Sequence, residues 1–268
     1  MNDIFKKIII MSDFDGTYTL YIQKNGVPQK NLDAIKRFEK LGGHFTFCTG
    51  RLPSIFKQLY PDFSSVCNAP LAMCNGGLLF DAKKDEVISS VFLDGEKAEK
   101  VICELREKFG DNIESSYFFD PEGKSESYQP GCGKGRGWYK FVNIFKSEEK
   151  TLEAKDYLIG KYGDEYNFFR SFNTVLEALD KSVSKEMRID TLKDYVSKET
   201  GIDKSELICC CIGDYENDTS MLKAADYSFC PENAIPYNKS ICDYVVCDCF
   251  SGAISEMIDV IEHNIINR

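Results

Sequence analysis

Acidic side chains, a hydroxyl and a lysine occupy positions in this chain where apolar runs end or helices begin. Asp13 and Asp15 follow an apolar run that ends at Met11, and Thr49 follows another that ends at Cys48. The set is completed by Lys185, Asp214 and Asp218. Ligands of open parallel sheets bind beyond the carboxyl ends of the strands. We therefore expect these side chains to meet at one edge of a sheet.

Four carboxylates gathered at one place repel one another unless a cation compensates their charge. Mg²⁺ is a natural compensating ion, because it binds oxygen ligands and combines one or two carboxylates with waters and phosphate oxygens. The lysine and the threonine suit an anionic group such as phosphoryl. One carboxylate can then attack phosphorus as a nucleophile, and another, two residues further on, can act as general acid and base.

The segments around these residues alternate between strand and helix patterns. Strands are expected at 6–11, 44–48, 71–74, 207–212, 227–230 and 244–247, and helices at 31–41, 53–59, 185–200, 218–224 and 252–266. Such alternation is typical of a parallel sheet covered by helices. The sequence therefore predicts an α/β protein with a Rossmann-like parallel-sheet core.

The middle of the chain has a different pattern. Helices are expected at 96–109 and 148–162, strands at 138–145, 166–171 and 175–179, and a loop rich in Gly, Pro and Ser at 121–137. Antiparallel strands with interspersed helices indicate a separate α+β unit. We predict a catalytic core made of residues 1–82 and 184–268, interrupted by an α+β cap at 83–183.

Four short stretches occur in order along the chain: Asp13-Phe14-Asp15-Gly16-Thr17, Thr49-Gly50-Arg51, Lys185 and Gly213-Asp214-Tyr215-Glu216-Asn217-Asp218. They resemble the four motifs of the haloacid dehalogenase (HAD) superfamily. The closer match is to its Cof-type sugar-phosphate phosphatases, which have a type IIB-like cap. That branch also shows stretches similar to Asn75-Gly76-Gly77, Val183-Ser184-Lys185 and Asn233-Ala234. The motifs cover both predicted core segments, whereas the cap matches only in length and pattern.

The resemblance implies a role for each matched residue. Asp13 resembles the nucleophile, and Asp15 resembles the acid/base, whose backbone carbonyl is also a metal ligand. Phosphate binding is implied for Thr49, Gly50, Lys185 and Asn217. The implied Mg²⁺ ligands are Asp13, Asp15, Asp214 and Asp218. Substrate contacts are expected from Arg51, Asn75 and Gly76, although Arg51 alternatively caps the helix that follows it.

The function that this resemblance implies is Mg²⁺-dependent hydrolysis of small phosphomonoesters, with sugar phosphates as the expected substrates, through an aspartyl-phosphate intermediate. One alternative is a sugar phosphomutase of the same superfamily. Such mutases carry a Gly-Trp-Asp-Lys-like stretch before the motif lysine, where this chain has Asp180-Lys181-Ser182-Val183-Ser184-Lys185. A second alternative is a non-catalytic metabolite-binding protein on the same fold.

Composition limits the partners of the chain. With 33 basic and 43 acidic residues the formal charge is −10, which opposes nucleic-acid binding. No apolar run is long enough for a transmembrane helix, and no secretory signal pattern is present, so a cytoplasmic location is expected. The twelve cysteines are expected to be reduced and mostly buried. A small phosphorylated metabolite is the expected partner, and the oligomeric state stays open.

The roles of the basic residues in two segments can each be interpreted in two ways. Lys181 competes with Lys185 for the role of the motif lysine. In the glycine-rich loop 131–137, Lys134 or Arg136 either reaches the substrate from the cap or belongs to a flexible basic turn. The second interpretation is favoured, because the loop lacks the spacing of a phosphate-binding Walker motif.

Two further groups of residues are expected near the cap. Tyr215 and Glu216, inside the last motif, can face the cap and help to select the leaving group. The aromatic pairs at 118–119 and 168–169 are expected to pack in the core of the cap rather than against the substrate.

Overall fold

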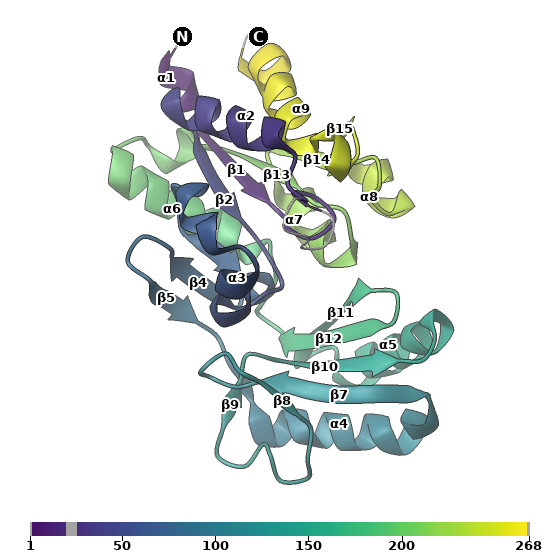
Figure 1. Cartoon of the computed structure of the whole chain (residues 1–268). Helices are drawn as coiled ribbons and strands as arrows, with labels where there is room; N and C mark the ends of the chain where they lie inside the picture. The colour runs from purple at the N-terminus through teal and green to yellow at the C-terminus, as the bar shows by residue number, and fades with distance from the viewer. Residues whose placement is uncertain (1, 20–25, 267–268) are drawn as a thin grey trace.

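The computed structural model describes residues 2–19 and 26–266, and Figure 1 shows the whole chain. Residues 1, 20–25 and 267–268, which belong to the predicted core segments, lie outside the described residues. Two large sheets occupy separate regions of the molecule in Figure 1, with the chain termini beside the first of them.

The main sheet has five parallel strands in the order β15-β14-β13-β1-β2. These strands are β1 (Ile8–Ser12), β2 (His44–Phe47), β13 (Ile208–Ile212), β14 (Tyr227–Pro231) and β15 (Tyr244–Val246). The interior strand β1, which lies between β13 and β2, is buried along its whole length, which explains the apolar run at 8–11. The predicted parallel α/β core is confirmed.

Helices cover both faces of this sheet. Ile8 and Ile10 contribute to an apolar cluster with α2 (Gln29–Lys40) and α9 (Ala253–Val260). Ile9 and Met11 point the other way, into a cluster that includes residues of α6 (Met187–Thr200) and α7 (Thr219–Ala224). The period-two alternation of a strand thus places both layers of helices. The remaining helices of this region are α1 (Asn2–Phe5), α3 (Pro53–Leu59), α8 (Pro236–Ile241) and the π-helical η7 (Ile261–Ile266).

A small antiparallel sheet corrects one expectation. The segment expected as a third parallel strand forms β3 (Leu71–Met73), which pairs with β4 (Leu78–Asp81), and β4 pairs with β5 (Glu86–Ser90). Next to the main sheet, the described residues give β3 one isolated bridge, a parallel one between Cys48 and Ala72. The β4–β5 hairpin was not predicted, because β5 is largely exposed and therefore lacks an apolar pattern.

The second sheet is antiparallel, in the order β11-β12-β10-β7-β8. Its strands are β7 (Ile113–Phe119), β8 (Ser125–Ser127), β10 (Lys140–Phe145), β11 (Tyr166–Phe172) and β12 (Val175–Asp180). The helices α4 (Gly95–Phe109) and α5 (Glu148–Tyr162) pack against it. Strand β8 lies within the expected loop, and the expected strand at 138–145 is divided, since β9 (Gly137–Trp138) pairs instead with β6 (Leu93–Asp94).

The aromatic pairs divide between the two faces of this second sheet. Phe118 and Phe168 pack among the residues of α4 and α5, as expected. Phe119 and Phe169 belong to the apolar cluster that extends to the main sheet. Consecutive residues of a strand point to opposite faces of the sheet. Only one member of each aromatic pair can therefore enter the core between this second sheet and the helices α4 and α5, which together are called the second unit below.

The cysteines are free thiols, and most of them are buried. The consecutive Cys209, Cys210 and Cys211 lie in β13 without exposure, where they pack as small apolar side chains. Burial raises the pKa of Cys48 to about 12, which keeps it protonated near neutral pH. Within the described residues, every helix is too short or too polar to span a membrane.

The interior position of β1 in the main sheet predicts a clear difference in stability between substitutions of two isoleucines. Ile10 is fully buried, whereas Ile88 in β5 is 46% exposed. We expect Ile10→Ala to lower the free energy of unfolding by about 2–5 kcal/mol, because it removes buried methyl groups and leaves a cavity. Ile88→Ala, the matched control, should cost about 0.5 kcal/mol or less. Urea denaturation of both variants checks this, and equal losses would contradict the assigned core.

Candidate active site

A cavity of about 670 Å³ lies between the carboxyl end of the main sheet and the second sheet. On the side of the main sheet it is lined by Asp13, Asp15, Gly50, Arg51, Asp214 and Asn217. On the opposite side its lining includes Tyr117, Phe119, Lys140 and Glu177. The expectation that polar residues would gather where the parallel strands end agrees with this geometry.

Three of the predicted carboxylates converge at the bottom of this cavity. Asp13 follows β1, Asp214 follows β13, and Asp218 lies in the short helix η5 (Glu216–Asp218). Each contributes one oxygen to a group whose members lie within 4.8 Å of one another. Lys185 Nζ donates hydrogen bonds of 2.5 Å to Asp13 Oδ1 and to Asp218 Oδ1. The lysine side chain is fully buried, so this contact is shielded from water.

The electrostatics of this site disfavour the ionised forms of Asp13 and Asp214, because three carboxyl groups are buried beside a single lysine. Burial, followed by repulsion from Asp218, raises the pKa of Asp13 well above its usual value. The same two causes raise the pKa of Asp214 to about 7. Burial acts against the charged form of Lys185, but attraction to Asp13 and Asp218 outweighs it and raises the pKa of the lysine. One ammonium group therefore faces three carboxyl groups.

The hydrogen bonds at these carboxylates show which oxygens can accept a metal. Asp218 Oδ2 already accepts the backbone amides of Asp214 and Tyr215, each at 3.0 Å. Thr17 Oγ1 donates to Asp214 Oδ1 at 2.8 Å. Within the described residues, no donor reaches Asp13 Oδ2 or Asp214 Oδ2. A pair of oxygens with negative charge and no donor fits a hard divalent cation.

The loop after β1 approaches Asp214 closely. Gly16 has a positive φ of +87°, and a Cβ at this position would lie 2.4 Å from Asp214 Oδ2. Only glycine combines this backbone conformation with so short an approach. Gly16 and Thr17 belong to the first motif, but sequence reasoning gave them no separate role; here both position Asp214.

Arg51 forms a two-point ion pair with Asp15. Its Nε donates to Asp15 Oδ2 and its Nη2 to Asp15 Oδ1, both at 2.7 Å. The guanidinium therefore does not cap α3, which has no side-chain cap, whereas the expected contact of Arg51 with substrate stays a prediction. Thr49 is fully buried and accepts the amide of Arg51 at 3.2 Å, so its hydroxyl lies beneath the cavity wall.

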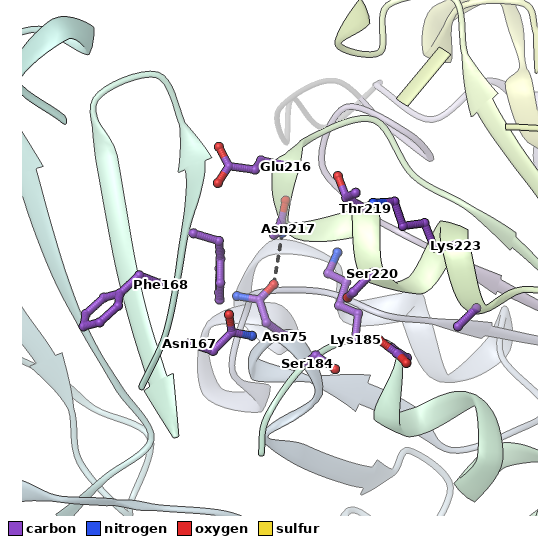
Figure 2. A pocket seen from close by; sticks show the side chains of 13 residues that line it. Asn75, Asn167, Phe168, Ser184, Lys185, Glu216, Asn217, Thr219, Ser220 and Lys223 are labelled. Carbon is purple, nitrogen blue, oxygen red and sulfur yellow. Dashed lines mark hydrogen bonds between the residues drawn. The ribbon is translucent and has the colours of Figure 1, made fainter. Parts of the chain in front are cut away.

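The side chains of Asn217 and Asn75 form a hydrogen-bonded pair beside the cavity. Asn217 Nδ2 donates to Asn75 Oδ1 at 3.0 Å, as the dashed line in Figure 2 shows. Asn217 lines both the main cavity and a second cavity of about 530 Å³, which Lys185 and Ser184 also line. Asn75 Nδ2 in turn donates to Glu177 Oε2 at 3.1 Å. The Asn75–Gly76–Gly77 stretch therefore connects the motif residues with the second sheet.

Gly76 does not line either cavity. Its carbonyl oxygen accepts Arg188 Nε at 2.6 Å, and a Cβ on Gly76 would lie 2.1 Å from the carbonyl oxygen of Ser184. Its position is therefore structural: it allows the backbone before Lys185 to pack directly against the Asn75 turn. The expected contact of Gly76 with substrate stays a prediction.

Two charged residues at this site were missed by sequence reasoning. Lys140 begins β10 and Glu177 lies in β12, and both are about 95% buried, with exposed fractions of 5% and 6%. Lys140 Nζ donates to Glu177 Oε2 at 2.7 Å and to the carbonyl oxygen of Gly50 at 2.9 Å. Burial acts against the charged lysine, but Glu177 outweighs it, so the pKa of Lys140 is raised. The signal that the sequence offers is one charged residue within each of the expected strands 138–145 and 175–179.

The last motif also contacts the second unit directly. Glu216 accepts Arg170 Nε at 2.9 Å and pairs with Lys155. Tyr215 donates its hydroxyl proton to Asn173 Oδ1 at 2.6 Å. The expectation that Tyr215 and Glu216 face this unit is confirmed.

The structure shows where the basic residues with two possible roles lie. Lys181 is exposed and donates to the carbonyl oxygen of Gly163, so Lys185 alone of the two reaches the carboxylates. The amides of the glycine-rich loop bind carboxylates of α4, as Gly133 does to Glu99 at 2.8 Å. Neither basic residue of that loop lines the main cavity, which agrees with the favoured interpretation of a basic turn.

A Rossmann-like parallel sheet with carboxylates and a lysine at its carboxyl edge places the protein among α/β proteins that bind their ligands at the ends of the strands. The chain matches the model of the haloacid dehalogenase-like hydrolase family over residues 10–258. It therefore belongs to this family, and the predicted membership is confirmed.

Solved structures with this fold span nearly the whole chain. A haloacid dehalogenase-like hydrolase from Bacillus subtilis is 17% identical, with a TM-score of 0.76 over 97% of this chain and 100% of that one. A HAD/COF-like hydrolase from Plasmodium vivax is 21% identical, with a TM-score of 0.74 over 96% and 95%. A Bacteroides thetaiotaomicron protein described among the phosphatases of the superfamily is 19% identical, with a TM-score of 0.70 over 94% and 93%. At these identities, the similarity shows a shared fold.

Removal of the buried lysine tests the charge balance of the site. Lys185→Gln leaves Asp13 and Asp218 buried without a counterion, so we expect it to lower the free energy of unfolding by about 3–5 kcal/mol. The exposed Lys181→Gln is the matched control, with an expected change of about 0.5 kcal/mol or less. Urea denaturation in EDTA at neutral pH measures both. A Lys185→Gln protein as stable as the control would contradict this assignment.

Proposed function

We propose that this hydrolase is a Mg²⁺-dependent phosphatase of small phosphomonoesters, sugar phosphates above all, which acts through an aspartyl-phosphate on Asp13. One observation carries the proposal: Lys185 holds one oxygen of Asp13 at the bottom of a cavity, while the other oxygen has no donor within the described residues. A carboxylate fixed in this way is oriented to attack a phosphoryl group that enters the cavity.

We propose that catalysis and the selection of the leaving group belong to two different parts of the chain. Residues 1–82 and 184–268 form the catalytic core, and residues 83–183 form a cap that closes the cavity and selects the leaving group. Closure of such a cap excludes bulk water and strengthens electrostatic interactions inside the site. Contacts across the cavity, such as Lys140 with the carbonyl oxygen of Gly50, support this division.

The metal would be held by Asp13, Asp214 and the backbone carbonyl of Asp15. Asp218 would act indirectly, because its two oxygens already accept Lys185 and two backbone amides. When bound, Mg²⁺ supplies positive charge that stabilises the phosphoryl oxygens in the transition state. The location of Asp15, Asp214 and Asp218 around Asp13 agrees with the metal set that the resemblance implies.

In the first step, an Asp13 oxygen attacks phosphorus and the bond between phosphorus and the leaving oxygen breaks. Asp15 gives its proton to that oxygen. In the second step, Asp15 takes a proton from water, which attacks the phosphorus of the aspartyl-phosphate and releases inorganic phosphate from Asp13. Lys185, Asn217 and the Thr49-Gly50 segment would bind the phosphoryl oxygens and stabilise their charge.

The two-point contact with Arg51 orients the proposed acid/base. Both oxygens of Asp15 accept hydrogen bonds from the guanidinium, which fixes the direction of the carboxyl group beside Asp13. Protonation of the leaving oxygen in the first step requires Arg51 to release one of the two oxygens, so Arg51 is a positioning residue for the acid/base.

Phosphate release from p-nitrophenyl phosphate tests the proposed function. We expect release in the presence of Mg²⁺, little in EDTA, and a loss of at least roughly 1,000-fold in Asp13→Asn, because the nucleophile is removed. Asp33→Asn, on the exposed surface of α2, is the matched control and should keep full activity. Absence of release from p-nitrophenyl phosphate and from a panel of sugar phosphates would instead favour the mutase or the binding protein.

A double-variant cycle tests the role of Arg51. We expect Arg51→Ala to lower kcat roughly 10-fold or more, because Asp15 loses its orientation. Added to Asp15→Asn, the same change should lower kcat by less than about 2-fold, since the residue that it positions is already absent. Arg37→Ala, which breaks only surface ion pairs, is the control. Additive losses in the double variant would show that Arg51 acts independently of Asp15.

A further inference from the structure

The cavity wall opposite the catalytic carboxylates is built around the ion pair of Lys140 and Glu177. Both residues line the cavity, although each is almost fully buried. Charged side chains are rarely buried in this way unless they are paired, and the pair is costly to desolvate. Neither residue belongs to the motifs that identify the family. They lie across the cavity from Asp13, where the leaving group of an ester attacked by Asp13 would be placed.

The hydrogen bonds of the pair fix both side chains. Lys140 Nζ contacts Glu177 Oε2 and the carbonyl oxygen of Gly50. Glu177 Oε2 also accepts Asn75 Nδ2, and its Oε1 accepts the hydroxyl of Ser171 at 2.7 Å. The pair is therefore anchored to the core through Gly50 and Asn75, and rigid side chains discriminate better between ligands than mobile ones.

The cavity wall opposite Asp13 carries no unpaired cationic side chain. Arg51 and Lys140 are the only cationic side chains that line the cavity among the described residues, and each is paired with a carboxylate. A second phosphate or a carboxylate on the leaving group would therefore have no unpaired cation to bind and would be repelled by the carboxylate of Glu177. An ammonium group on the leaving group would be repelled by the ammonium group of Lys140. A second charge of either sign is disfavoured in such a desolvated place.

Neutral hydroxyl groups fit the same wall. An ammonium group has three protons, and two of those on Lys140 have oxygen acceptors. Glu177 Oε1 accepts from one donor and can accept another. A hydroxyl both donates and accepts, so it can bind to both partners at once. The rings of Tyr117 and Phe119, with centroids 5.7 Å apart, add an apolar surface for the C–H face of a sugar ring.

We propose that the Lys140–Glu177 pair determines specificity, selecting phosphate esters whose leaving group is an uncharged polyhydroxylated alcohol and rejecting those with a second charge. This inference rests on the proposed phosphatase function and narrows its substrate class to monophosphates of neutral sugars or polyols. It also separates the protein from phosphomutases that act on sugar bisphosphates.

Three sugar phosphates of similar size form the test: glucose 6-phosphate with a neutral leaving group, 6-phosphogluconate with a carboxylate, and glucosamine 6-phosphate with an ammonium group. For the wild type we expect kcat/KM to be at least about 10-fold higher with glucose 6-phosphate than with either charged ester. Glu177→Gln leaves Lys140 without its carboxylate, so the ratio of glucose 6-phosphate to 6-phosphogluconate should fall at least about 10-fold. Lys140→Gln should lower the ratio of glucose 6-phosphate to glucosamine 6-phosphate in the same way.

Glu114→Gln and Lys134→Gln, at exposed positions of the same unit, are the matched controls and should keep the wild-type ratios. Ratios within one variant do not depend on the fraction of folded enzyme, and the wild-type ratios need no variant at all. A wild type that prefers a charged ester, or ratios that stay constant in both pair variants, overturns the inference while p-nitrophenyl phosphate hydrolysis still supports the proposed function. No hydrolysis of any ester overturns both.

Discussion

The contact of Lys185 with Asp13 and Asp218 is the interaction on which the site depends. The two carboxylates stand 172 and 33 residues from the lysine in the chain, and the three groups are buried together. Burial alone disfavours each of these charges, so they persist because they compensate one another. This requirement fixes how β1, α6 and the loop after β13 must approach. Other details, including Gly16 against Asp214 and Gly76 against Ser184, are close approaches that allow this convergence.

The two sides of the cavity have different electrostatic characters. The floor has three carboxyl groups around one lysine, an arrangement in which a bound cation would relieve the repulsion between the carboxylates and attract a phosphoryl group. The opposite wall balances one lysine with one glutamate. Asn75 connects the two sides, because it contacts both Asn217 and Glu177. A single ligand thus meets a charged end and a neutral end within one cavity.

Much of the core was predictable from sequence, because its strands are buried on both faces and end in motif residues. The runs before Asp13 and Asp214 have only one reasonable interpretation as strands, and ligands of parallel sheets lie at strand ends. The partners of Arg51 and the pairing of Lys140 with Glu177 were not predictable. These contacts join segments far apart in the chain, and no spacing rule connects them. The β4–β5 hairpin escaped prediction for a local reason, since its exposed second strand has no apolar pattern.

The order of the strands in the main sheet has a consequence for synthesis on the ribosome. β1 pairs on one side with β2 and on the other with β13, which begins at residue 208. The unit at 93–180 has emerged in full before β13 exists, and its strands pair with near neighbours in the chain. Until β13 arrives, one edge of the apolar strand β1 stays unpaired, a condition that favours association with other chains. The nascent protein therefore leaves one edge of β1 unprotected until β13, at Ile208–Ile212, has emerged.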